Sequence, residues 1–135
     1  MPSNTMNFEI FDSSKNKMKE MEIILDQNED VLDSIKLVMK QHNITKANII
    51  VFEGILMTLS VNYFENSKLK NIKYFEPHEV IKGFGELKYD FIKNYLLGRI
   101  RIIYKHKDKN FDGVLMSGKA KEGFKIVFTY LEEKV

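Results

Sequence analysis

The chain has no cysteine and no long apolar run among its 135 residues. Without cysteine it can form neither a disulfide nor a thiolate metal site. No signal-like apolar segment follows Met1, and no run approaches the roughly 20 apolar residues that a membrane-spanning helix needs. We therefore expect a cytoplasmic protein with no membrane partner.

The chain also lacks a large excess of positive or negative charge. Lys and Arg total 21 against 19 Asp and Glu, a formal net charge of +2. A balance this even excludes non-specific nucleic-acid binding through a global positive field, so any such contact needs a local patch. With 44% apolar and 30% charged residues, the composition is that of one globular domain.

One helix is predicted clearly, after the acidic pair Glu29 and Asp30 and before Asn43. An apolar stripe at helical spacing supports it, formed by Val31, Leu32, Ile35, Val38 and Met39. The acidic residues suit the positive end of the helix dipole, and Asn43 is a plausible C-terminal stop.

Alternating apolar residues and turn signals predict about seven strands around this helix. Residues 47–52 are nearly all apolar, which favours a central strand buried on both faces, broken at Glu53 and Gly54. Residues 96–106 alternate as one strand. We predict an α+β fold: a mainly antiparallel sheet with one main helix packed on it, a domain over residues 18–135, and a flexible or loosely docked segment over residues 1–17.

Short motifs along the chain resemble the PPC ("plants and prokaryotes conserved") domain family, in its stand-alone bacterial type without an AT-hook. They are Glu29-Asp30-Val31-Leu32, the glycine Gly54, Asn62-Tyr63-Phe64-Glu65, the stretch from Glu79 to Gly85, and the stretch from Asp112 to Gly118. The resemblance implies a seven-stranded antiparallel sheet with a helix, assembly as a homotrimer, and the association with DNA attached to the family.

The residues that would carry metal chemistry in that family are replaced. Many prokaryotic members have histidines at the positions of Arg99, Arg101 and Val114, a set suited to a metal. Guanidinium stays protonated and cannot serve as an ordinary ligand. We therefore expect no metal site and no cofactor.

Arg99 and Arg101 are the only arginines, and strand alternation places them on one face. They could bind an anion as a bidentate pair, form salt bridges with Glu53, Glu79 or Glu86, or simply be exposed. Glu53 follows a buried run, so it either needs a partner there or points outwards at a bulge. The candidate anion or ligand site is Arg99, Arg101 and Glu53.

Lys105, Lys107 and Lys109 surround Tyr104 and could contact nucleic-acid phosphates, although such a run is also typical of a solvated hairpin. The Arg-Gly-Arg-Pro core of an AT-hook is missing, which argues against minor-groove binding of that kind.

The three histidines, His42, His78 and His106, fall in unrelated segments, and we interpret them as ordinary helix-end, turn and strand-end residues.

No catalytic motif is present, which favours a non-catalytic, oligomeric binding module. It would be a homotrimer, with DNA or another protein as its further partner. The alternative is a protein or enzyme that binds an anionic small molecule in a pocket between subunits.

Overall fold

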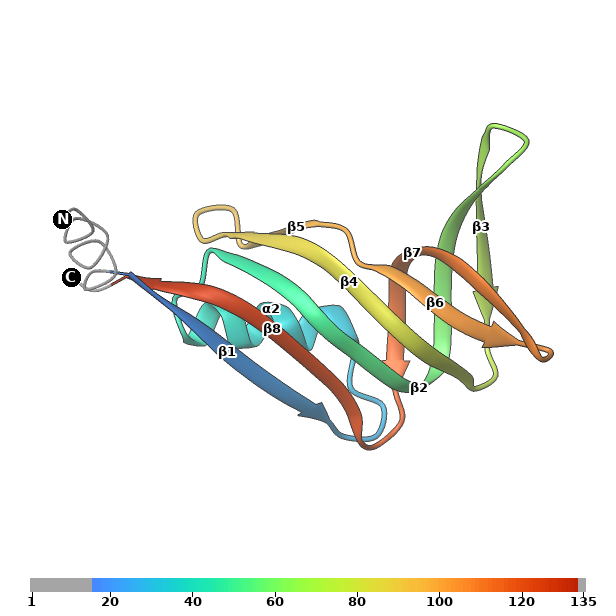
Figure 1. The fold of residues 1–135 in the computed structure, drawn as a ribbon, viewed down its shortest axis with the longest axis horizontal. Helices are drawn as coiled ribbons and strands as arrows, with labels where there is room; N and C mark the ends of the chain where they lie inside the picture. The colour runs from blue at the N-terminus through green and yellow to red at the C-terminus, as the bar shows by residue number, and fades with distance from the viewer. Residues whose placement is uncertain (1–15, 134–135) are drawn as a thin grey trace, which may run out of the picture.

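The computed structural model describes residues 16–133, which form one helix and eight strands (Figure 1). In chain order they are β1 (Asn16–Leu25), α2 (Val31–Gln41), β2 (Lys46–Glu65), β3 (Lys68–Tyr74), β4 (His78–Asp90), β5 (Tyr95–Gly98), β6 (Arg101–His106), β7 (Lys109–Ala120) and β8 (Phe124–Glu133). All the strand pairs are antiparallel, which confirms a mainly antiparallel α+β fold.

The long strand β2 organises the sheet. The strand order is β1-β8-β2-β7-β6-β4-β5, with β3 paired to β2 and a further pairing between β2 and β4. The first half of β2 pairs with β8 and β4, and its second half with β7 and β3. Because β4 also pairs with β6, and β6 with β7, the strands β2, β7, β6 and β4 close into a ring.

Helix α2 begins and ends where the sequence predicts. The Asp30 carboxylate accepts a hydrogen bond from the backbone N–H of Asp33 at 2.9 Å and so caps the first turn. Asn43, just past the last turn, has φ of 56°, the left-handed conformation common after helices. Val31, Ile35 and Met39 on the apolar stripe are fully buried, and the helix contacts β7, β1 and β4.

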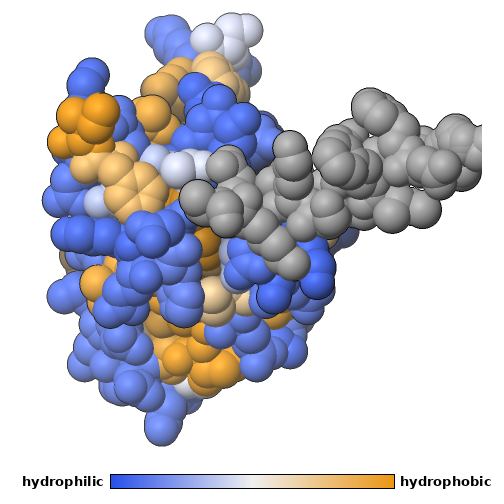
Figure 2. Space-filling view, turned by 90° about the vertical axis from the view of Figure 1, so that its left-hand side faces the viewer, coloured by the Kyte–Doolittle hydropathy of each residue, from blue (hydrophilic) through white to orange (hydrophobic). Residues whose placement is uncertain are grey.

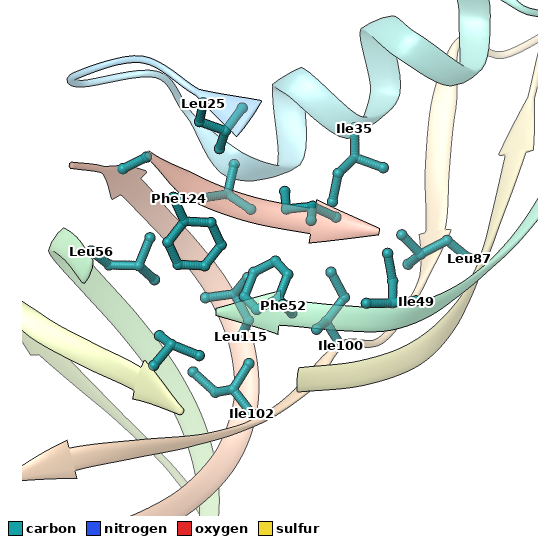
Figure 3. Packing of buried hydrophobic residues seen from close by; sticks show 14 of the residues in the cluster. Leu25, Ile35, Ile49, Phe52, Leu56, Leu87, Ile100, Ile102, Leu115 and Phe124 are labelled. Carbon is teal, nitrogen blue, oxygen red and sulfur yellow. The ribbon is translucent and has the colours of Figure 1, made fainter. Parts of the chain in front are cut away.

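The core lies between the helix and the curved sheet (Figure 3). Phe52 from β2 and Phe124 from β8 lie at its centre, with ring centroids 4.8 Å apart and an edge-to-face interplanar angle of 75°. Ile35 from the helix and Ile102 and Leu115 from the ring of strands belong to the same cluster. One continuous core therefore joins both halves of β2.

The predicted count of about seven strands is corrected to eight, and two of the predicted strand boundaries change. First, residues 96–106 do not form one strand: β5 ends at Gly98, whose φ is 118°, and β6 starts at Arg101. A Cβ on Gly98 would lie 2.2 Å from the carbonyl oxygen of Glu86, so only glycine permits this approach. Second, β2 continues through Glu53 and Gly54, with its register shifts elsewhere.

The expectation that residues 47–52 are buried on both faces is wrong. Ala47, Ile49 and Phe52 are buried, but Ile50 between them is 46% exposed. A strand of an antiparallel sheet can leave one face to solvent, so a run of apolar residues does not by itself mean two covered faces.

The predicted N-terminal segment 1–17 falls almost entirely outside the described residues, which begin at Asn16 in β1. Within residues 16–133 the single helix is too short and too polar to cross a membrane.

We predict that Phe52→Ala lowers the free energy of unfolding by about 3–5 kcal/mol, because it empties the centre of the core. Phe75→Ala is the matched control, since Phe75 is 79% exposed and should cost less than about 0.5 kcal/mol. Urea unfolding followed by circular dichroism measures both, and equal effects would contradict this description of the core.

Candidate functional site

A groove of about 910 Å³ runs between the ends of β2, β5, β6 and β7. Arg99 and Arg101 both line it, although Arg99 lies before β6 and not on the single strand that the sequence predicts. Its apolar lining includes side chains that are substantially exposed to solvent: Phe64, Leu69, Tyr95, Phe111 and Met116. The groove therefore combines two guanidinium groups with exposed aromatic and aliphatic surface.

Close backbone packing fixes the position of Arg99, and an ion pair orients Arg101. Arg99 lies between β5 and β6, where its carbonyl oxygen approaches Gly85 so closely that an added Cβ would lie 1.9 Å from it. Arg101 opens β6, and its Nη1 lies 3.5 Å from Oδ2 of Asp112. Both side chains of this ion pair are more than half exposed, so the pair contributes little to stability.

Arg99, Arg101 and Val114, the positions that the resemblance matches to histidines of many prokaryotic members, come together in space. Arg101 and Val114 are directly opposite each other on β6 and β7, and both line the groove with Arg99. No group of three or more His, Asp or Glu that could hold a metal ion occurs within the described part of the chain. At these three positions the chain has two guanidinium groups and an isopropyl group, which are not ordinary metal ligands.

Glu53 lies away from the two arginines. It is exposed and lines a separate depression of about 380 Å³ together with Glu79 and Lys125. Lys125 is its direct cross-strand neighbour on β8. The structure therefore brings Arg99 and Arg101 together but places the third predicted residue elsewhere.

Lys105, Lys107 and Lys109 lie on the β6–β7 hairpin, and all three are exposed. Lys107 and Asp108 form its two-residue turn with φ of 51° and 65°, the left-handed values that tight hairpins require. Lys109 is directly opposite His106. The hairpin is therefore locally basic at its tip.

A pair of histidines is the feature that sequence reasoning missed. His42 is the exposed C-cap of α2, but Nε2 of His78 lies 2.8 Å from Nδ1 of His106. Nδ1 of His78 lies 2.9 Å from the carbonyl oxygen of Glu76. His78 starts β4 and is buried, whereas His106 ends β6 and is half-buried.

The rings of Tyr74 and Tyr104 pack against this imidazole pair. The ring centroid of Tyr74 lies 4.2 Å from that of His78 and 4.9 Å from that of His106. The hydroxyl groups of Tyr74 and Tyr104 lie 3.2 Å apart. Burial raises the pKa of Tyr104 well above its usual range, and the hydrogen bond to Tyr74 raises it further.

Exposed apolar surface also occurs outside the groove. Figure 2 shows the end of the molecule that carries the β4–β5 connection, with hydrophobic surface between hydrophilic residues. Ile92 in that connection is 96% exposed. Its turn is held by Oδ1 of Asp90, which accepts hydrogen bonds from the backbone N–H groups of Ile92 and Lys93.

A protein-family model described as the Plants and Prokaryotes Conserved (PCC) domain matches residues 12–127. No curated protein matches the chain.

Several solved structures share the fold. A metal-containing protein from Archaeoglobus fulgidus has a TM-score of 0.71 at 16% identity, covering 87% of this chain and 82% of its own. A plant- and prokaryote-conserved protein from Pyrococcus horikoshii has a TM-score of 0.65 at 20% identity, covering 87% and 80%. A "putative DNA binding protein" from Bacteroides thetaiotaomicron has a TM-score of 0.66 at 13% identity, covering 86% and 83%.

We predict that Tyr104→Phe makes the protein less sensitive to alkaline pH. With its pKa raised by burial, Tyr104 stays neutral in the folded state while the same group ionises in the unfolded chain above about pH 10. The neutral Tyr104 therefore makes its full contribution to stability below about pH 10. This contribution is lost as the pH rises towards the raised pKa of Tyr104 in the folded state. Urea unfolding at about pH 8 and about pH 11 should show a smaller loss for Tyr104→Phe than for the wild type, and an equal loss would contradict the prediction.

Proposed function

Because the chain belongs to the Plants and Prokaryotes Conserved domain family, we propose that it is a non-catalytic binding module that assembles as a homotrimer. The single observation that supports this most is the groove, where exposed apolar side chains surround Arg99 and Arg101. Phe64 is 74% exposed and Leu69 61%, and both line this groove. Apolar surface gathered in one place is typical of a protein interface.

In this proposal the groove lies at the boundary between subunits. The exposed aromatic residues supply the apolar contact area, which is the main favourable contribution to association. The two guanidinium groups then lie beside the interface, where a neighbouring subunit limits the access of water and so strengthens their interaction with an anion.

The further partner that the surface fits is a nucleic acid. Lys105, Lys107 and Lys109 project from the β6–β7 hairpin, and lysines of this kind contact phosphate groups without reading sequence. Relatives with the same fold include proteins named "putative DNA binding protein" from Bacteroides thetaiotaomicron and "Putative DNA-binding protein" from Ralstonia eutropha. Binding through these lysines would weaken with added salt.

A second function is favoured by the arginines themselves. Both guanidiniums line one groove, and Arg101 forms an exposed ion pair with Asp112. An anionic small molecule could displace that carboxylate and bind both arginines, in a pocket completed by the neighbouring subunit. Bidentate hydrogen bonding to carboxylate or phosphate is the chemistry that guanidinium performs best.

We predict that Met116→Lys dissociates the assembly, because it introduces a charge among the apolar side chains of the groove. Light scattering should give a trimer for the wild type and a smaller species for the variant at the same micromolar concentration. Ile92→Lys is the control, since Ile92 is exposed outside the groove and should leave the mass unchanged. A monomeric wild type, or a trimeric Met116→Lys, would remove the proposal.

We predict that Arg101→Lys leaves the melting temperature nearly unchanged but weakens the binding of inorganic phosphate by about tenfold, because lysine keeps the charge and loses one charge-assisted hydrogen bond. Asp112→Asn is the control: it removes the ion-pair partner but keeps both guanidiniums, so phosphate binding should persist. Calorimetric titration measures both. Equal phosphate affinity in the wild type, Arg101→Lys and Arg101→Ala would rule out an anion site at Arg101.

A further inference from the structure

The hydrogen bonds around the imidazole pair leave only one arrangement of protons when both rings are neutral. The carbonyl oxygen of Glu76 can only accept, so Nδ1 of His78 donates to it. A neutral imidazole has one N–H, so Nε2 of His78 must accept, and Nδ1 of His106 donates to it. The remaining nitrogen, Nε2 of His106, carries the lone pair.

This arrangement can take up one proton without losing a contact. A proton on Nε2 of His106 makes that ring a cation while its Nδ1 still donates to His78, and the bond between the rings becomes charge-assisted. A second proton would have to enter on Nε2 of His78, where it would face the N–H of His106. The pair is therefore built to hold one positive charge, on the half-buried ring.

The groups around the pair are compatible with that charge. Tyr74 and Tyr104 contribute neutral phenols, and the Tyr74 ring lies against both imidazoles. The ring of Phe111 from β7 lies 6.2 Å from that of His106. The charged groups on the neighbouring elements are exposed: Glu76 before β4, Glu79 on β4, Lys105 on β6, Lys107 and Asp108 in the turn, and Lys109 on β7.

The protonated ring of His106 would lie beside the lysines of the β6–β7 hairpin. His106 and Lys109 are directly opposite each other on β6 and β7, so their side chains share one face, and Lys107 follows in the turn. We propose that Nε2 of His106 binds phosphate groups together with Lys107 and Lys109, and that it does so only when the imidazole pair has taken up its single proton. This inference rests on the proposed phosphate contact of the hairpin and adds its regulation.

The proposal predicts tighter phosphate binding at acidic pH. We would measure a rhodamine-labelled DNA duplex by fluorescence anisotropy at constant ionic strength, at about pH 5.5 and about pH 8, on either side of the range in which histidine ordinarily titrates. The wild type should bind about fivefold to tenfold more tightly at the lower pH, and this ratio should fall to about one in His106→Gln. His42→Gln, which removes the exposed histidine of the helix cap, should keep the wild-type ratio.

The outcomes separate this inference from the proposed function. If the wild type binds the duplex at neither pH, the proposed nucleic-acid contact of the hairpin fails and this inference falls with it, whereas the proposed assembly is tested separately by Met116→Lys. If it binds but His106→Gln keeps the full pH dependence, only the role of His106 is overturned. Inorganic tripolyphosphate as a competitor distinguishes the two sources of phosphate: displacement at equimolar phosphate indicates a general polyphosphate site, whereas resistance indicates a surface that needs the duplex.

Nitrogen-15 NMR of the imidazoles tests the proton arrangement without any ligand. His78 should remain in the Nδ1–H form while His106 becomes a cation as the pH falls. A cationic His78 at the same pH as a cationic His106 would overturn the proposed arrangement, as would a His106 that stays neutral at about pH 5.5.

Discussion

The backbone hydrogen bonding of β2 is the constraint on which the rest of the molecule depends. This single strand pairs with β8 and β4 along its first half and with β7 and β3 along its second. Its midpoint is Gly54, where an added Cβ would lie 2.8 Å from the ring of Phe124. A side chain there would clash with Phe124 at the centre of the core, so the close approach of β2 to β8 at this point requires glycine.

Arg101 and His106, on which the two candidate sites depend, lie at opposite ends of β6. Arg101 faces Val114 at the end of the β6–β7 ladder that lines the groove, and His106 faces Lys109 at the end that carries the turn. Five residues of extended chain separate them along β6, roughly 17 Å. The lining of the groove continues along β7 to Asn110 and Phe111, so an anion at Arg101 and a phosphate at the hairpin would be held by one hydrogen-bonded unit.

The sequence predicts those features that depend on neighbouring residues. The apolar stripe, Asp30 and Asn43 define α2 because helix formation is local. The two arginines reach one groove as predicted, but not through strand alternation, because Arg99 lies in the connection between β5 and β6. The pairing of His78 with His106 could not be predicted, since it depends on the register between β4 and β6, which β5 separates along the chain. The location of Glu53 could not be predicted either, because it depends on the pairing of β2 with the distant strand β8.

Strand β8 pairs with β1 on one side and with β2 on the other. The last strand of the described chain thereby lies between two strands from its first half. While the ribosome is still making residues 124–133, β1 has no neighbour in the sheet and one side of the first half of β2 is unpaired. These edges would be open to pairing with other chains during synthesis. A fold with so many pairings between distant segments is also expected to form slowly, over about milliseconds to seconds, so its vulnerable period comes before the last strand is in place.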